Sequence, residues 1–153
     1  MPTNPFRSAA EVITFAIGRE IEAAEAYARW ADLARTPGLR ELLLDLRDQE
    51  VSHRRLLEGL TDEAIRGLEP AFVPDLRIVD ALADETPAGD MSFQEVLIFA
   101  ARKEKQAAEL YESLARTAAG TGHQQLFLFL AGQEREHKLK LEAEYEKNVL
   151  QEN

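Results

Sequence analysis

Residues 49–53 read Gln-Glu-Val-Ser-His, and residues 133–137 read Gln-Glu-Arg-Glu-His. Each stretch contains a Glu-x-x-His motif, and the two motifs lie 84 residues apart. One glutamate precedes each motif at the same distance, Glu20 in the first case and Glu104 in the second. The recurring set therefore has four carboxylates and two imidazoles, which is the ligand inventory of a two-metal site in a helix bundle.

The recurrence extends over most of the chain. Residues 8–58 align without a gap with residues 92–142, and 21 of the 51 aligned positions are identical. Unrelated sequences of average composition would share roughly three or four. Because polar positions match as well as apolar ones, we interpret the chain as an internal duplication rather than as amphipathic helices that share a register by chance.

Helix signals occur at the same place in each half. Ser-x-x-Glu capping boxes begin at Ser8 and Ser92, and apolar residues then recur at helical spacing. The pattern breaks at Thr36-Pro37-Gly38, where proline suits the first position of a helix, and at Gly120-Thr121-Gly122. We predict helices over residues 9–35, 38–58, 93–119 and 123–148, with a short helical turn at 61–67.

The halves are joined by a long segment, residues 60–91, which contains three prolines. Loops of this length are uncommon in compact domains unless they serve topology or function. Short breaks make the helices of each half antiparallel, and a long crossover lets the third helix start at the same end as the first. We therefore predict an all-α, single-domain protein over residues 1–153. Its fold would be a ferritin-like four-helix bundle with one crossover between helices two and three and a pseudo-twofold repeat.

The motif residues are predicted to point inward. Residues three apart neighbour each other on one helix face, so the glutamate and histidine of each motif can reach one point. Buried glutamates are rare unless they are paired or coordinated, and four facing carboxylates would repel one another. Two divalent cations would cancel this charge. The predicted metal ligands are Glu20, Glu50, His53, Glu104, Glu134 and His137.

Ligand type limits the metal. Mixed oxygen and nitrogen donors with open positions suit iron or manganese, whereas zinc usually takes fewer ligands. We predict two iron ions, with manganese and zinc as substitutes. Tyr27 and Tyr111 each follow an upstream ligand glutamate by seven residues. They are either hydrogen-bond partners of the ligands or core tyrosines.

The amino-acid composition limits the classes of partner that the protein is expected to bind. The formal net charge is −10, which argues against nucleic acid and against an anionic membrane surface as partners. No apolar stretch approaches the ~20 residues that a membrane span needs. The chain has no cysteine, and its start lacks the pattern of a secretory signal. These features predict a cytoplasmic protein.

At these motifs the chain resembles the di-iron domain of rubrerythrins, in the ferritin-like superfamily. The similar segments are residues 20–27, 49–53, 103–111 and 133–137. The resemblance implies that Glu50 and Glu134 bridge two metals, while the other two glutamates and both histidines are terminal ligands. It further implies reduction of hydrogen peroxide as iron cycles between ferrous and ferric states, and a homodimer by analogy.

Two departures from the family pattern bear on the reaction. Rubrerythrins commonly carry a rubredoxin domain with four cysteines, and this chain has none, so electrons would come from a separate donor protein. The family also places an additional glutamate where this chain has Ala107.

Three functions remain open on the sequence. The first is a di-iron oxidoreductase that reduces peroxide or dioxygen. The second is a ferroxidase or iron-storage protein, for which the acidic surface would attract cations. The third is a structural or interaction module that the metals merely stabilise.

Overall fold

The structure is a computed structural model, and it describes residues 8–68 and 92–152. Within these two ranges the chain forms helices and turns and has no strand, which confirms the all-α prediction for this part of the chain. The chain divides into two compact units, residues 1–72 and residues 73–153. Each unit contains one of the two repeat halves.

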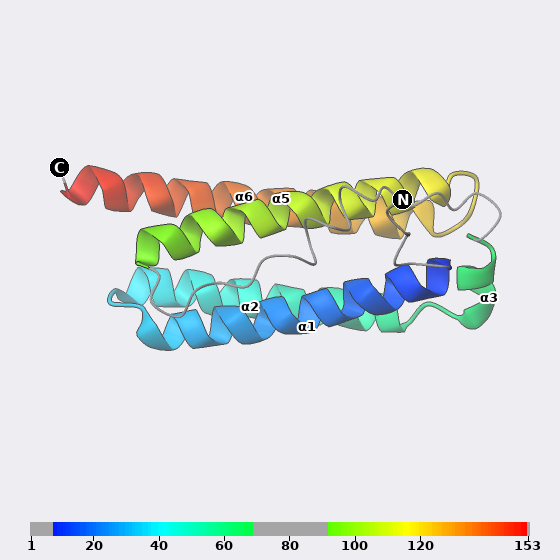
Figure 1. The fold of residues 1–153 in the computed structure, drawn as a ribbon, viewed down its shortest axis with the longest axis horizontal. Helices are drawn as coiled ribbons and strands as arrows, with labels where there is room; N and C mark the ends of the chain where they lie inside the picture. The colour runs from blue at the N-terminus through cyan, green and yellow to red at the C-terminus, as the bar shows by residue number, and fades with distance from the viewer. Residues whose placement is uncertain (1–7, 69–91, 153) are drawn as a thin grey trace, which may run out of the picture. The chain divides into compact units, whose positions relative to one another are not determined.

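The first unit is a helical hairpin followed by a short helix. Helix α1 spans Ala9–Leu33, α2 spans Pro37–Glu58 and α3 spans Asp62–Arg66. Helices α1 and α2 run antiparallel and pack along their lengths, and α3 touches α1 (Figure 1). The predicted helices 9–35 and 38–58 and the turn at 61–67 are thus confirmed within two residues.

Local side-chain bonds explain where these helices begin. The Ser8 hydroxyl accepts a hydrogen bond from the Glu11 backbone N–H at 3.2 Å. The Thr36 hydroxyl accepts one from the Leu39 N–H, also at 3.2 Å, and Pro37 occupies the first position of α2. Both hydroxyls satisfy backbone donors that have no partner inside the helix.

The second unit is a hairpin of α5, which spans Phe93–Thr117, and α6, which spans Gln124–Glu152. These two helices also pack antiparallel (Figure 1). The complete capping box forms at Ser92: its hydroxyl accepts from the Glu95 N–H, and the Glu95 carboxylate accepts from the Ser92 N–H. Helix α6 runs four residues past the predicted end at 148, because no glycine or proline follows residue 132 to stop it.

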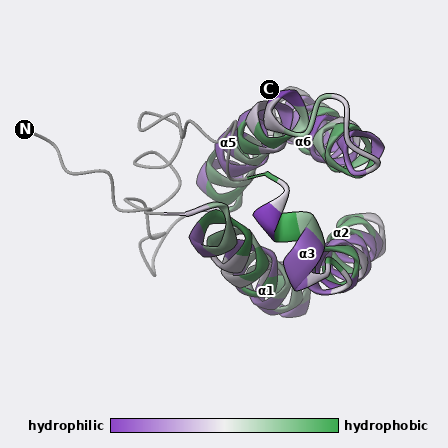
Figure 2. Cartoon of the chain, turned by 90° about the vertical axis from the view of Figure 1, so that its right-hand side faces the viewer, coloured by the Kyte–Doolittle hydropathy of each residue, from purple (hydrophilic) through white to green (hydrophobic). Residues whose placement is uncertain are grey.

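Within each hairpin the packed faces are mostly apolar, with a few buried charged and histidine side chains. In Figure 2 the long helices carry both hydrophobic and hydrophilic residues, as amphipathic helices do. The leucines that flank the two Glu-x-x-His motifs on α2 and α6 are fully buried: Leu46, Leu57, Leu130 and Leu141. Among the described helices, none combines the length and the apolar character that a membrane crossing requires.

The predicted crossover, residues 60–91, lies largely outside the described residues. Only residues 60–68 are described, and they include α3. The crossover and the four-helix bundle that it would close therefore remain predictions.

Gly120 gives a test of the turn between α5 and α6. The φ of Gly120 is 82° and lies in the left-handed region, whereas the φ of Gly38 in α2 does not. An added Cβ would meet no atom within 4 Å at either position. Gly120→Ala should therefore lower the free energy of unfolding by about 1–2 kcal/mol. Gly38→Ala, the control, should leave it equal or raise it by about 0.5 kcal/mol. Urea unfolding measures both, and equal effects would contradict this account of the turn.

Candidate metal centre

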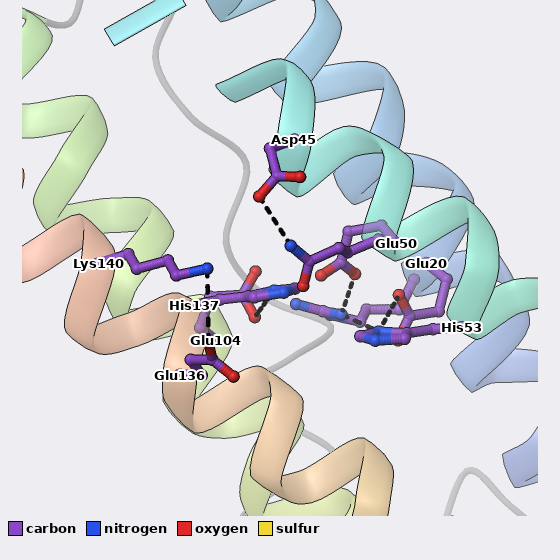
Figure 3. A network of polar contacts seen from close by, with 10 residues as sticks. Glu20, Asp45, Glu50, His53, Glu104, Glu136, His137 and Lys140 are labelled. Atoms are coloured by element: carbon purple, nitrogen blue, oxygen red, sulfur yellow. Dashed lines mark hydrogen bonds and ion pairs between the residues drawn. The ribbon is translucent and has the colours of Figure 1, made fainter. Parts of the chain in front are cut away.

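The first unit brings three predicted ligands together. Glu20 comes from α1, while Glu50 and His53 lie one turn apart on the facing side of α2, and all three are buried. Each offers a ligand atom, and these atoms lie within 4.8 Å of one another. Figure 3 shows the three side chains converging from the two helices. The i, i+3 spacing of the motif places its two members on the face that packs against α1.

An arginine that the sequence reasoning missed joins this set. Arg19 is only 8% exposed, and its Nη1 donates to Oε1 of Glu20 at 3.2 Å and to Oε2 of Glu50 at 2.9 Å. The signal that could have revealed it is a cation directly before each upstream glutamate, Arg19 in one half and Lys103 in the other. In the second unit, the Lys103 ammonium lies 5.6 Å from the centroid of the Phe99 ring.

The charge state of Glu20 follows from these neighbours. Burial raises the pKa of Glu20, but the positive charge of Arg19 and hydrogen bonds with Glu50 and His53 outweigh it and lower this pKa from 4.5 to about 2. Nδ1 of His53 lies 3.7 Å from Oε2 of Glu20. At neutral pH Glu20 is therefore an anion, the form in which a carboxylate binds a metal.

The second unit repeats the arrangement. Glu104 comes from α5, Glu134 and His137 come from α6, and all three are buried. Their ligand atoms also lie within 4.8 Å of one another. Nδ1 of His137 lies 3.5 Å from Oε2 of Glu104, which reproduces the histidine–glutamate approach of the first unit (Figure 3).

Each unit thus holds a buried set of two carboxylates and one imidazole, which we call the α1–α2 set (Glu20, Glu50, His53) and the α5–α6 set (Glu104, Glu134, His137). Both sets could hold a metal ion. Two carboxylates buried in a hairpin are costly unless positive charge accompanies them. Carboxylate oxygen with imidazole nitrogen suits iron and manganese, so the donors present fit the predicted metals.

The two tyrosines near the ligands are core residues. Tyr27 and Tyr111 are both buried, and the Tyr27 ring meets Trp30 edge-on, with centroids 5.7 Å apart. The predicted role of these tyrosines as hydrogen-bond partners of ligands stays a prediction. Ala107, at the position where the family pattern has a glutamate, is fully buried.

A pocket of about 240 Å³ opens beside the α1–α2 set. Glu20 forms part of its lining, together with Ile21, Ala24, Glu25, Ala28, Arg47, Val51 and Arg54. The repeat mates of Ala28 and Val51 are Glu112 and Arg135. In the second unit these two form an ion pair across α5 and α6, with Arg135 Nε donating to Glu112 Oε1 at 2.7 Å. The duplicated hairpins therefore differ at this position, where one has small apolar side chains and the other a salt bridge.

Comparisons of this chain with protein-family models, curated proteins and solved structures give no match.

Histidine substitution tests the two sets directly. His53→Ala and His137→Ala should each weaken Mn²⁺ binding by at least roughly tenfold, because each removes the only nitrogen donor of its set. His123→Ala is the matched control, since His123 is the third histidine of the chain and lies in the turn before α6. Titration calorimetry on the chelator-treated protein measures the affinities. Equal affinities for all three variants and the unchanged protein would exclude the sets as ligands.

Proposed function

We propose that the protein is a di-iron oxidoreductase of the rubrerythrin type, which reduces hydrogen peroxide or dioxygen with electrons from a separate donor protein. In this proposal the α1–α2 and α5–α6 sets act together on two iron ions inside a ferritin-like four-helix bundle. Glu50 and Glu134 would bridge the ions, and the other four residues would be terminal ligands. The observation that carries the proposal is the repetition of one buried donor set in both hairpins.

Charge matching supports two ions rather than one. Each set contributes two carboxylates and a histidine, so its charge balances one divalent cation when the imidazole is neutral. One ion for each set then gives a centre in which every ligand carboxylate is neutralised. Two iron ions bridged by carboxylates would supply two electrons to one oxidant molecule.

The side chains around the two sets would control how water and the oxidant reach the ligand carboxylates. Fully buried leucines flank both motifs, Leu46 and Leu57 on α2 and Leu130 and Leu141 on α6, and they keep water from the ligand carboxylates. The pocket beside Glu20 has apolar walls and is large enough for peroxide or dioxygen. We propose that it is the route by which the oxidant reaches the α1–α2 set.

Two sequence features shape the reaction. The sequence has no cysteine to hold an electron-transfer iron, and a separate donor protein is the proposed source of electrons. Ala107 supplies no donor atom, so the ligand set stays at six residues. Without a donor at position 107, the proposed site has no additional glutamate for a redox-dependent change of ligand.

The proposal is tested by metal analysis of natively purified protein, followed by single-turnover mixing of the ferrous form with peroxide and with dioxygen. We expect two irons per chain and oxidation much faster than that of free ferrous ion. Oxidation no faster than that of free ferrous ion would refute the oxidoreductase. Uptake of many irons per chain into a large assembly would indicate storage instead.

A purely structural role of the metals is distinguished by Glu50→Ala. If the metals only stabilise the fold, this variant should have a lower thermal midpoint and an unchanged cellular role. We expect instead that the folded, metal-depleted variant loses peroxide reduction and the associated phenotype. If cells with the folded, metal-depleted variant behave like cells with the unchanged protein, the metals have only a structural role.

The pocket is tested by copying the salt bridge of the second hairpin into the first. Ala28→Glu with Val51→Arg should fill the pocket and slow ferrous oxidation by peroxide by roughly tenfold or more, while iron content stays the same. The reciprocal control, Glu112→Ala with Arg135→Val, should leave the rate unchanged. Stopped-flow absorbance measures both rates. An unchanged rate in the first variant would exclude this route.

A further inference from the structure

Arg19 contacts the α1–α2 set but has no role in the proposed metal ligation. Its guanidinium lies between two predicted ligands, at 3.2 Å from Glu20 and 2.9 Å from Glu50. The bridge spans both helices, because Glu20 is on α1 and Glu50 is on α2. A single nitrogen, Nη1, makes both contacts.

These contacts are strong ones. All three side chains are buried, and hydrogen bonds between ionised groups in a dry interior are stronger than neutral ones. Without a positive charge, Glu20 and Glu50 would hold two like charges in an apolar hairpin. Arg19 therefore supplies one positive charge beside these two carboxylates, part of the compensation that a divalent ion could also bring.

A metal ion and the Arg19 guanidinium would repel each other if both were bound to the carboxylates of Glu20 and Glu50. Arg19 contacts one oxygen of each carboxylate, and an ion bound at ~2 Å to the other oxygens of Glu20 and Glu50 would still lie within a few ångströms of the guanidinium. Their repulsion is poorly screened in a buried site. The guanidinium must then leave the two carboxylates when the ion arrives.

We propose that Arg19 is an internal counter-ion of the α1–α2 set, which stabilises the metal-free protein and which a metal ion must displace in order to bind. This inference rests on the proposed metal binding by that set. It makes Arg19 a residue that lowers metal affinity, in contrast to one that orients the ligands. A purely structural salt bridge would instead stabilise the metal-free and metal-bound forms equally.

The test uses the full chain with Arg19→Gln, in both the metal-free and the Mn²⁺-bound forms. In the metal-free form we expect the thermal midpoint to fall by roughly 5–10 °C, because two buried carboxylates lose their cation. Calorimetry should show Mn²⁺ binding roughly tenfold tighter than in the unchanged protein. With saturating Mn²⁺ the difference in midpoint should shrink, since the ion replaces the missing charge.

Two further variants keep the result interpretable. Arg40→Gln is the control, because it removes the same charge from α2 at an exposed position outside the pocket. It should change neither the midpoint nor the affinity. Arg19→Lys keeps a charge but lacks the planar fork, so its affinity should lie between those of the unchanged protein and Arg19→Gln. It also serves if Arg19→Gln does not fold without metal.

The direction in which Mn²⁺ affinity changes in Arg19→Gln decides whether Arg19 is a counter-ion. Weaker or unchanged Mn²⁺ binding in Arg19→Gln, or in Arg19→Lys if that variant alone folds, would overturn the counter-ion role. An equal loss of midpoint with and without Mn²⁺ would also overturn it, in favour of a structural salt bridge. If the unchanged protein binds neither Mn²⁺ nor Fe²⁺, both the proposed function and the Arg19 inference fail. If it binds these ions and Arg19→Gln does not bind Mn²⁺ more tightly, only the Arg19 inference fails.

Discussion

Buried negative charge is the constraint on which both hairpins depend. Each hairpin packs through leucines and alanines, yet each also buries two glutamates among them. Removing a carboxylate from water costs several kcal/mol, so such residues persist only beside compensating charge. In the first hairpin Arg19 provides part of that compensation. The donor sets of both hairpins are suited to receive the rest from metal ions.

The duplication explains why the two hairpins are alike and where they differ. The histidine–glutamate approach recurs at 3.7 Å and 3.5 Å, as expected when the same motif is carried by the same pair of helices. The differences lie beside the ligands. The pocket next to Glu20 is matched in the second hairpin by the pair of Glu112 and Arg135. The two halves thus share their buried Glu and His residues and differ in what surrounds them.

Most of the local structure could be predicted from the sequence, because its causes are local. Capping hydroxyls such as those of Ser8 and Thr36 act over three residues, and they marked helix starts to within one residue. Helix ends were predicted less well: α5 stops two residues early, before the turn that needs Gly120, and α6 continues past 148 for want of a stop signal. The grouping of each Glu-x-x-His pair could be predicted because the i, i+3 relation within a helix is independent of tertiary contacts. Glu20 and Glu104 were predicted from the 84-residue repeat.

Arg19 shows what a sequence pattern does not contain. Periodicity assigns a residue to a helix face, and the position next to Glu20 belongs to a different face from the ligand itself. A long arginine side chain can nevertheless bend back and bury its head, and whether it does so depends on which acceptors the neighbouring helix presents. Glu50, 31 residues away in the chain, presents one. Helices, caps and ligand spacing therefore followed from short-range rules in the sequence, whereas the packing of α1 against α2 decided that Arg19 joins the ligands.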